Sequence, residues 1–557
     1  MILGIDVGGT HTDAVLLDGL IVRKKAKVPT NHEQLLDSLL AVTEEIFSDL
    51  GPDVLERVVL STTMSTNAIV QGTVSPVGMI VAAGPGISPD FLRINDHTHI
   101  VSGYANHRGI IVSPVRDEEI DRVVSLIKDA GIDHLGIVGK FSTRNPGIET
   151  NIADRTADRF RHVSLGHRMS GNLNFPRRIA TTYLNAAVWD IYNSFVNNIN
   201  RFVSRFDGGY PIYILKADGG TFEIAQSVKC PVQTILSGPA ASIMGILSLT
   251  ECGEDAIALD IGGTTTDIAI FAGGVPLLEP LGVTIEGHKT LIRGLRTRSI
   301  GIGGDSRVRC EDGTIIIGPE RAGPAAAFGG PAATPTDAMI VLNLAEIGDR
   351  EKAVAAIDGI SHKTGLSMVE TAQAIYDSAC EKITAAVQAM IREINNEPVY
   401  TVHELLEGKT IEPTALYVVG GPAEAMAPRL GELLRCRSEI PEHAEVANAI
   451  GAALARTTTE LTILADTEQG VLTIVEEGIQ IRIDSGFDRE KAREVCREHL
   501  EKRAISMGAR KDEIEIEITE DQSFNMVRGY FTAGKNIRIK GQVKPGLIAG
   551  LRKGTEA

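Results

Sequence analysis

The chain has 557 residues, of which 43% are hydrophobic and 23% are charged, and its formal net charge is -17. This length exceeds one ordinary hydrophobic core and predicts two or three domains of a soluble globular protein. The negative charge disfavours nucleic acid and anionic membrane surfaces as partners, although backbone amides can still hold the phosphates of a nucleotide.

The six cysteines are scattered, with no Cys-x-x-Cys pair. This spacing disfavours a disulfide framework or a structural zinc site and fits a reducing compartment. The N-terminus lacks the basic and apolar regions of a signal peptide, and no run of apolar residues is long enough to span a membrane. We therefore expect a cytoplasmic protein.

Strands and helices are predicted to alternate through most of the chain, which is typical of an α/β fold. Early strands are predicted at 3–7, 13–17, 57–62, 78–83 and 134–140, and early helices at 32–50 and 117–131. Residues 175–206 predict one long amphipathic helix, with Pro176 near its start and Gly208-Gly209 closing it. A second α/β block then begins at 211, and residues beyond about 460 predict a small α+β unit with a charged helix at 488–508.

One motif, Asp-x-Gly-Gly-Thr-x-Thr-Asp, occurs twice, at residues 6–13 and 260–267. Each copy lies between apolar runs and predicts a tight hairpin. Glycine permits positive φ and lets successive N–H groups face one concavity, which binds phosphate oxygens. A single copy is usually only a turn. Two copies, one opening each α/β block, predict two half-sites that grip one polyphosphate from opposite sides.

The candidate site residues follow from these two loops. Backbone amides and hydroxyls at the phosphate are expected from Gly8, Gly9, Thr10, Thr12, Gly262, Gly263, Thr264 and Thr266. Asp6 and Asp260 lie where a carboxylate can hold the waters around Mg²⁺. Asp13 and Asp267 could order the same metal as catalytic residues, or could instead bond only their own turns.

The two loops resemble the phosphate-1 and phosphate-2 motifs of the actin-like ATPase superfamily. LYVVGGPAEAMAPRLGELL at 416–434 resembles its adenosine motif. There a buried strand ends at Gly420-Gly421, where absent side chains let adenosine lie on the backbone, and Pro422 opens the next helix. The resemblance implies a two-lobed fold of duplicated ribonuclease H-like domains that binds ATP. A plain strand-to-helix connection is the alternative for the third motif taken alone.

Within that superfamily, residues 1–460 resemble the hydantoinase A, 5-oxoprolinase and acetone carboxylase β-subunit family. The shared motifs occur in order: STTMSTNAIVQG at 61, TTYLNAAV at 181, KADGGTF at 216, LSGPAASIMG at 236, GIGGDS at 301, GGPAATPTDA at 329 and VANAIGAAL at 446. GIGGDS adds Gly303 and Gly304 to the nucleotide-binding candidates. His11 stands where the family commonly has an aromatic residue, so the substrate stays open.

This resemblance implies an ATP-dependent hydrolase that phosphorylates an amide or ketone carbonyl oxygen, activating it for hydrolysis or carboxylation, with ATP and Mg²⁺ as cofactors. It also implies a small-molecule amide or ketone substrate, a second, hydantoinase B-like subunit and compatibility with a homo-oligomer. A small-molecule kinase and an activator or chaperone-like ATPase are the alternatives. The implied domains are an N-terminal lobe at 1–180, a second lobe at 181–459 and an α+β unit at 460–557.

Three histidines close in sequence, at 97, 99 and 107, could bind a metal or a substrate carbonyl, although a polar surface loop is the plainer interpretation. The turns at 218–221 and 237–239 are candidate pocket residues through the family resemblance only.

Two further expectations concern single side chains. Arg177 and Arg178, at a helix start, are expected to be solvated. Asp337 is expected to be the N-cap of the helix that begins at residue 338, with a phosphate or ribose contact as its second role.

Overall fold

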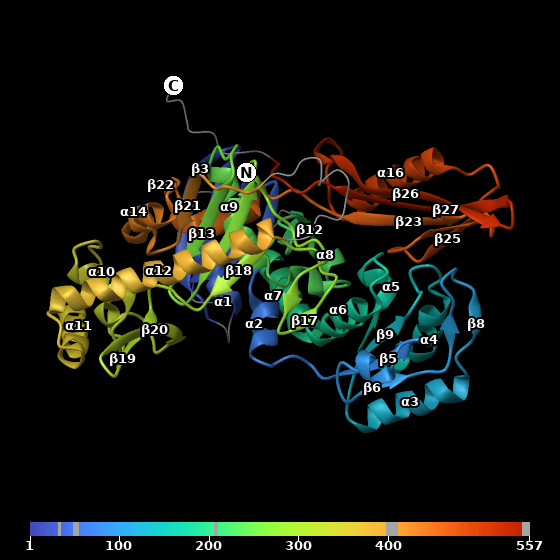
Figure 1. Cartoon of the computed structure of the whole chain (residues 1–557), viewed down its shortest axis with the longest axis horizontal. Coiled ribbons are helices and arrows are strands. Elements are labelled where there is room, and N and C mark those ends of the chain that lie inside the picture. Colours follow the sequence, from blue (N-terminus) through green and yellow to red (C-terminus); the bar gives the residue numbers. More distant parts are fainter. Residues whose placement is uncertain (10, 32–34, 48–54, 205–209, 397–409, 549–557) are drawn as a thin grey trace. The chain divides into compact units, whose positions relative to one another are not determined.

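The computed structural model describes residues 1–9, 11–31, 35–47, 55–204, 210–396 and 410–548 (Figure 1). Within these residues the chain forms two compact units. Unit 1 comprises Met1–Ala240, Glu279–Gly294 and Ala452–Ile548, and unit 2 comprises Ala241–Leu278 and Leu295–Gly451. The three-domain division expected from the sequence stays a prediction. In the described part of the chain, no helix combines the length and apolar character that crossing a bilayer requires.

The main sheet of unit 1 has six strands in the order β12-β11-β4-β1-β2-β3. Their bounds are β1 (Ile2–Val7), β2 (His11–Asp18), β3 (Ile21–Pro29), β4 (Arg57–Thr62), β11 (Ile212–Leu215) and β12 (Thr221–Glu223). The central strands β1, β4 and β11 run parallel, and β1, β2 and β3 form an antiparallel meander. Helices α1 (Leu35–Ile46) and α7 (Trp189–Val203) bury their apolar stripes in the core of this sheet.

A second sheet of unit 1 has the parallel order β10-β9-β5-β6. Its elements are β5 (Val77–Ala82), β6 (Thr98–Ile100), β9 (His134–Gly139) and β10 (His162–Leu165), with helices α3 (Asp117–Asp129), α4 (Gly147–Thr156) and α6 (Phe175–Ala187). The β5 and β9 strands are buried along their whole length, as a parallel sheet covered on both faces requires. Helix α3 confirms the helix predicted at 117–131.

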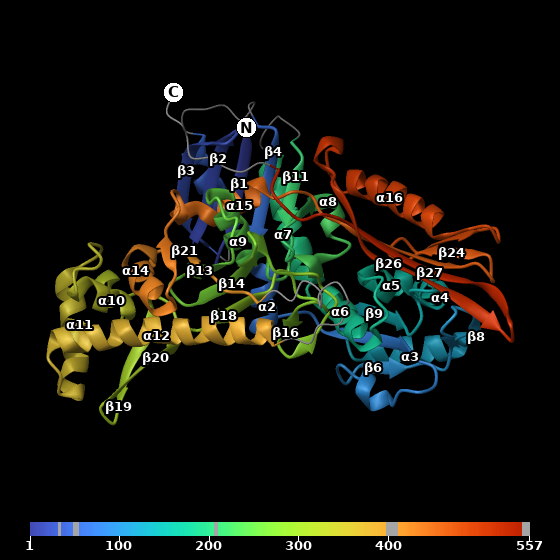
Figure 2. The same cartoon turned by 45° about the horizontal axis from the view of Figure 1, so that its top comes forward.

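The C-terminal part of unit 1 is an antiparallel sheet in the order β25-β24-β23-β27-β26. Its strands are β23 (Glu460–Asp466), β24 (Val471–Ile474), β25 (Ile479–Arg482), β26 (Ile516–Arg528) and β27 (Phe531–Val543). Helix α16 (Arg489–Ser506) lies along one face of this sheet in both views (Figure 1 and Figure 2). Ala492, Cys496 and Leu500 on α16 are buried in the core it shares with the strands. The predicted α+β character and the predicted charged helix are confirmed.

Shorter elements complete unit 1: α2 (Met64–Val70), β7 (Tyr104–Ala105), β8 (Ile111–Ser113), α5 (Gly166–Met169), α8 (Ile224–Ser227), β16 (Thr284–Ile285) and β17 (His288–Lys289). Two of the boundaries between the units fall inside helices, one in α9 (Ser237–Leu249) and one in α15 (Ala447–Leu454).

The single helix predicted at 175–206 is wrong, because α6 ends at Ala187 and α7 begins at Trp189. The carbonyl of Ala187 accepts a hydrogen bond from the backbone N–H of Ser75 (3.0 Å), so a tertiary contact uses a group that a continuous helix would need. Pro176 lies in the first turn of α6, as expected, and Asn174 caps that helix. Gly208 and Gly209 lie outside the described residues.

Unit 2 is built on a sheet in the order β15-β14-β13-β21-β22, with β18 paired to β14. Its strands are β13 (Ala256–Ile261), β14 (Thr266–Ala272), β15 (Val275–Pro276), β18 (Thr297–Ile300), β21 (Ala415–Val419) and β22 (Arg437–Glu439). A hairpin of β19 (Ser306–Glu311) and β20 (Thr314–Arg321) and the helices α10 (Pro335–Val341), α11 (Arg350–Thr364), α12 (Met368–Asn395) and α14 (Ala423–Leu434) complete it.

The two units repeat one arrangement. In unit 1 the β1–β2 hairpin pairs Asp6 with Asp13, and β1 lies parallel to β4. In unit 2 the β13–β14 hairpin pairs Asp260 with Asp267, and β13 lies parallel to β21. The repeated motif therefore marks the same place in two similar sheets, and the predicted duplicated, actin-like α/β fold class is confirmed.

Candidate functional site

The first repeated loop is a tight turn at the end of β1. It closes through a hydrogen bond from the Gly8 N–H to the His11 carbonyl (3.0 Å). Asp6, the second-last residue of β1, is buried and accepts a hydrogen bond from Ser61 Oγ on the adjacent strand β4 (2.5 Å). The Asp13 carboxylate, opposite Asp6 in the register, forms an ion pair with Lys27 (2.9 Å).

The second loop has the same closure in unit 2. The Gly262 N–H donates to the Thr265 carbonyl (2.9 Å). Asp260 accepts a hydrogen bond from Ser242 Oγ (2.5 Å), as Asp6 does from Ser61. In each unit, therefore, a serine holds a strand-end aspartate beside a Gly-Gly turn.

Asp267 differs from Asp13 in its electrostatic surroundings. No basic side chain forms an ion pair with Asp267 among the residues that the structure describes. Burial, and then the neighbouring Asp260 carboxylate, raise the pKa of Asp267 to about 7, although a hydrogen bond with Ser299 acts against the rise. Two carboxylates facing each other without a basic partner on Asp267 suit a divalent cation.

None of the four loop glycines has the positive φ that glycine permits, and close approach of neighbouring atoms accounts for two of them. A Cβ on Gly8 would lie 2.8 Å from the His11 carbonyl oxygen, and a Cβ on Gly263 would lie 2.7 Å from Asp305 Oδ2. A Cβ on Gly9 or Gly262 would meet its nearest atom at 3.8 or 3.4 Å. The expected use of positive φ in these turns is therefore wrong, and steric room is the physical reason for glycine at Gly8 and Gly263.

The threonine hydroxyls of the loops have mixed surroundings. Thr12 and Thr266 are fully buried, and their hydroxyls bond Thr30 Oγ1 (2.9 Å) and the Ile302 carbonyl (2.7 Å). Both hydroxyls therefore anchor a neighbouring segment to the hairpin. Thr264 is partly exposed, and Thr10 lies outside the described residues. Phosphate contact by these threonines stays a prediction.

The GIGGDS segment lies directly on the second loop. The Gly304 N–H donates to the Gly262 carbonyl (2.9 Å), and the Asp305 N–H donates to the Gly263 carbonyl (2.6 Å). A Cβ on Gly303 would lie 2.5 Å from the Gly262 oxygen. Gly303 and Gly304 thus lie beside the second loop, and their contact with a nucleotide stays a prediction.

The adenosine-type motif has the predicted local structure. Strand β21 ends at Val419, and α14 follows with Pro422 as its N-cap. Gly420 has φ +97°, and a Cβ there would lie 2.3 Å from the Ile261 carbonyl oxygen and 2.9 Å from Asp260 Oδ1. A Cβ on Gly421 would meet no atom within 4 Å, so open space adjoins its backbone. Contact with adenosine stays a prediction.

Sequence reasoning missed Ser61 and Ser242 as residues of the site. Both lie in segments quoted for the family resemblance, STTMSTNAIVQG and LSGPAASIMG, but neither was singled out. Ser61 precedes α2, where the Asn67 side chain donates to Thr63 Oγ1 (3.2 Å) close to Gly9. A serine at the end of a strand adjacent to a catalytic-type aspartate is the signal that could have identified Ser61.

Two single-residue expectations are wrong. Arg178 is fully buried and donates hydrogen bonds to the carbonyls of Asn172, Gly139 and Lys140, so it is a structural crosslink. Thr334 is the N-cap of α10, which starts at Pro335. Asp337 is the third residue of a capping box and also accepts from the N–H groups of Ala326 and Ala327.

In the described part of the chain, His97, His99 and His107 do not gather into a cluster of three metal ligands. His99 lies in β6, and burial, followed by His97 and Arg93, lowers its pKa. Across the described ranges, no cluster of three or more His, Cys, Asp or Glu side chains could hold a metal. Mg²⁺ commonly keeps several waters and binds one or two carboxylates, so this finding concerns sites rich in protein ligands.

Comparison with known proteins gives one consistent result. The sequence model of the Hydantoinase/oxoprolinase family matches residues 178–461, and that of the Hydantoinase/oxoprolinase N-terminal region matches residues 2–159. Caprolactamase subunit alpha of Pseudomonas jessenii is 24% identical over 90% of this chain and 79% of its own length. The 5-oxoprolinase 1 of Arabidopsis thaliana is 22% identical over 57% of this chain, which spans only 29% of that protein.

The fold is also that of a solved structure. A nucleotide-free acetone carboxylase structure, described as part of a study of ATP-dependent acetone carboxylation, superimposes with a TM-score of 0.73 at 18% identity. The match covers 100% of this chain and 89% of that chain.

Proposed function

Because the chain belongs to the hydantoinase/oxoprolinase family, we propose that it is the ATP-using subunit of an enzyme that phosphorylates the carbonyl oxygen of a small amide or ketone. It is an ATP-dependent hydrolase of the cyclic-amide type. The observation that supports this proposal is the duplicated hairpin, in which Asp6 and Asp260 each lie beside a Gly-Gly turn and each accept a serine hydrogen bond.

The residues present fit MgATP by their chemistry. The Gly8-Gly9 and Gly262-Gly263 turns carry no side chains after β1 and β13, which lets a phosphate group approach the loop backbone. Burial, and then the facing Asp260 carboxylate, raise the pKa of Asp267, and a bound Mg²⁺ would lower it again. When bound, MgATP supplies the phosphoryl group that turns the carbonyl oxygen into a leaving group.

The chain's own residues would position the nucleotide and its metal, and their carboxylates would offset the charge of the metal. Ser61 and Ser242 orient the carboxylates of Asp6 and Asp260, so these side chains need no rearrangement when the nucleotide binds. Asp267 and Asp260 would hold the metal or its waters, and Lys27 forms an ion pair with Asp13 in the first hairpin. Gly421 leaves room for the adenosine moiety beside β21.

A second subunit completes the reaction. The relative from Pseudomonas jessenii is named as a subunit, so its enzyme has more than one kind of chain. The match with 5-oxoprolinase 1 spans 29% of that longer protein, so most of that protein lies outside the match. We assign hydrolysis or carboxylation of the activated carbonyl to a hydantoinase B-like partner, because an activated carbonyl needs a site that controls the access of water.

The test supplies the purified chain with ATP, Mg²⁺ and a panel of hydantoins, lactams and ketones, and follows ADP and organic product separately. We expect at least one small amide or ketone to stimulate ADP formation, and product release to require the partner. Complete amide hydrolysis by this chain alone would refute the proposal that a partner subunit is required. ATP turnover that responds only to a client protein would favour an activator ATPase, and a stable phosphorylated product would favour a kinase.

A further inference from the structure

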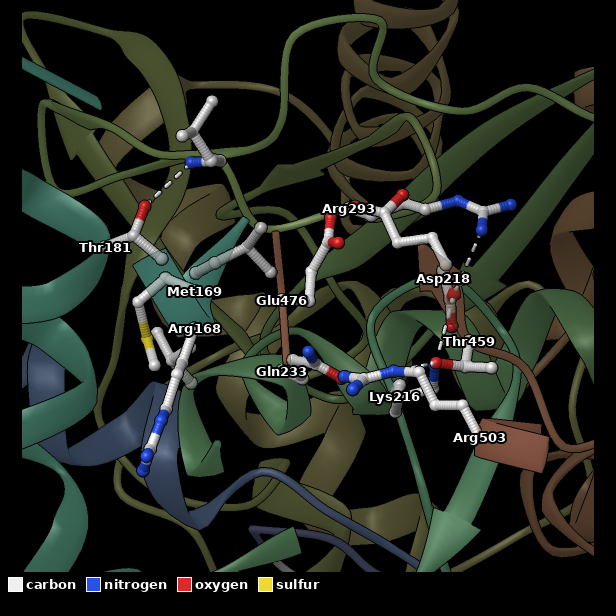
Figure 3. Close-up of a pocket in the computed structure, with 14 residues that line it drawn as sticks. Arg168, Met169, Thr181, Lys216, Asp218, Gln233, Arg293, Thr459, Glu476 and Arg503 are labelled. Atoms are coloured by element: carbon white, nitrogen blue, oxygen red, sulfur yellow. Dashed lines mark hydrogen bonds and ion pairs between the residues drawn. The ribbon is translucent and has the colours of Figure 1, made fainter. Parts of the chain in front are cut away.

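A cavity of about 40 Å³ lies within unit 1, and no residue of the Gly-Gly turn after β1 lines it (Figure 3). Its charged walls come from the turn after β11, from the segment Glu279–Gly294, from the start of β23 and from α16. The lining contains four basic and three acidic side chains: Arg168, Lys216, Arg293, Arg503, Asp218, Glu460 and Glu476. So many charges around one small space call for an explanation, because burying them is unfavourable unless each finds a partner.

The cavity shares a sheet edge with the first Gly-Gly turn. Strands β1, β4 and β11 are parallel neighbours, so their carboxyl ends meet at one edge. Gly8 follows β1 at this edge, and Lys216 and Asp218 follow β11. Two strand spacings separate the two positions, or about 10 Å along the edge. The cavity therefore lies at the same edge of the sheet as the phosphate-binding candidate in unit 1.

Lys216 and Asp218 satisfy each other and the surrounding backbone. Lys216 Nζ donates to the Thr458 carbonyl (2.8 Å) and lies 3.5 Å from Asp218 Oδ2. Asp218 also accepts from the Gly220 N–H (3.0 Å) and from Thr458 Oγ1. Burial opposes ionisation of Asp218, but Lys216 and then Arg293 hold its pKa below the ordinary value. Lys216 and Asp218 therefore have hydrogen-bond partners within the protein and do not need a ligand.

Arg293 is different, because its hydrogen-bonding groups are not used. Both terminal nitrogens are shielded from solvent, and neither makes a hydrogen bond to any residue that the structure describes. Its Nη1 lies 3.8 Å from Asp218 Oδ2, an ion-pair distance too long for a hydrogen bond (Figure 3). A buried guanidinium without acceptors is unfavourable, and a planar pair of oxygens matches its fork of N–H donors.

The remaining charges favour one negative ligand. Glu460 pairs with Lys540 (3.0 Å), and Arg503 Nε donates to Thr459 Oγ1 (3.0 Å). Glu476 accepts from the N–H groups of Gly171 and Thr462. Burial, and then Glu460, raise the pKa of Glu476, which adds to the positive balance of the cavity. The lining has four basic and three acidic side chains, so its charges leave a positive excess that favours an anion.

We infer that this cavity binds a carboxylate group of the substrate through the two terminal nitrogens of Arg293, and that the substrate is therefore a carboxylate-bearing cyclic amide or keto acid. This inference rests on the proposed function for its choice of amide or ketone. The volume has room for about three water molecules, which is the size of a carboxylate and not of a whole ring. The carbonyl end of the molecule extends along the sheet edge toward Gly8.

The experiment compares ligands that differ only in the carboxylate. Binding of 5-oxoproline and 2-pyrrolidinone, and of levulinate and 2-pentanone, is measured by isothermal titration calorimetry on the full chain. We expect at least one acid to bind about tenfold or more tightly than its neutral counterpart, as a charge-assisted bidentate contact provides. Arg293→Gln should abolish this preference, and Arg293→Lys should restore part of it because charge returns without the fork.

Arg23→Gln is the matched control, because Arg23 is an exposed partner of Asp18 far from the cavity lining. It should keep the preference for the acid. Thermal melting of every variant checks that the fold is retained, and Arg293→Lys keeps the test decisive if Arg293→Gln does not fold.

Three outcomes would overturn the inference. Acid and neutral ligands could bind equally, or the preference could survive both Arg293 substitutions. Alternatively, bicarbonate or phosphate could bind in an Arg293-dependent way while every acid and neutral pair binds alike, which would assign the cavity to a free inorganic anion. If the acid preference depends on Arg293 but no small molecule stimulates ATP turnover, the cavity assignment stands and the proposed function fails.

Discussion

The hairpins at 6–13 and 260–267 share a sequence and a turn geometry but differ in what surrounds them. In the first, Asp13 is paired with Lys27, and the adjacent strand β4 leads into Thr62 and Thr63. In the second, Asp267 faces Asp260 and has a raised pKa, and the adjacent strand β21 leads into Gly420 and Gly421.

This difference indicates that the two copies of the motif have different roles. A carboxylate already neutralised by a lysine has less need of a cation, whereas Asp267 beside Asp260 gains from one. After β4 the chain continues with Thr63, which carries a side chain. After β21 it continues with glycines, and the backbone is uncovered at Gly421. We therefore expect the second hairpin to hold the metal and to adjoin the nucleoside, and the first to meet the phosphate on the substrate side.

The largest expected effect comes from removing either strand-end aspartate. Asp6→Ala and Asp260→Ala should each lower kcat for ATP turnover by about 100-fold or more, because each carboxylate is preorganised by a serine. Asp18→Ala, which removes an exposed carboxylate from the end of β2, should leave the rate unchanged. A steady-state ADP assay measures all three variants, and a loss confined to one aspartate would mean that only one hairpin serves the nucleotide.

Asp267→Asn and Asp13→Asn should change the stability of the chain in opposite directions. The native pKa of Asp267 is raised to about 7 from 3.8, so the unfolded state releases this proton first, and stability is lost as pH rises from about 4 to 7. Asp267→Asn removes this loss and should stabilise the chain by about 2 kcal/mol at pH 8, after a reduction for its partial exposure.

Asp13→Asn should instead destabilise the chain, because it breaks the pair with Lys27. Melting temperatures in a chelator at pH 4.5 and pH 8 distinguish the two variants. The gain from Asp267→Asn should shrink at pH 4.5 and also when Mg²⁺ is added at pH 8, since the metal stabilises the ionised wild type. A gain that is equal at both pH values would show that packing, and not charge, is responsible.

The open backbone at Gly421 gives a smaller expected effect. Gly421→Val should weaken ATP binding about tenfold by crowding the nucleoside, and should leave inorganic triphosphate binding nearly unchanged. Gly359→Val on α11, where an added Cβ also meets no atom, is the control for a general effect of valine. Equal weakening for both ligands would exclude a nucleoside contact at this position.

The smallest expected effect concerns the serines. Ser61→Ala and Ser242→Ala should each lower kcat about fivefold, because losing one hydrogen bond to a carboxylate that water can replace costs about 1 kcal/mol. The decrease should appear in kcat and not in the KM for ATP, since the serines orient the aspartates and do not reach the nucleotide. A change in KM alone would place these hydroxyls in direct contact with the ligand.

The sequence by itself determined the features that depend on neighbours in the chain. The hairpin closures at Gly8 and Gly262 join residues three apart, so glycine and threonine chemistry is sufficient to predict them. The strand β21 and the Pro422 start of α14 are local in the same sense. The family motifs, which occur in a fixed order, added the fold class and the ATP-using function.

The tertiary structure decided everything that joins distant residues. Ser61 reaches Asp6 across 55 positions, and Arg293 meets Asp218 because the segment Glu279–Gly294 packs in unit 1. The contact of Ser75 with Ala187 divides a helix whose amphipathic pattern runs on without interruption. Burial and the approach of Asp260 raise the pKa of Asp267, whose twin Asp13 instead meets Lys27 on the next strand. Side-chain charge and burial depend on three-dimensional neighbours, and a repeated motif does not specify them.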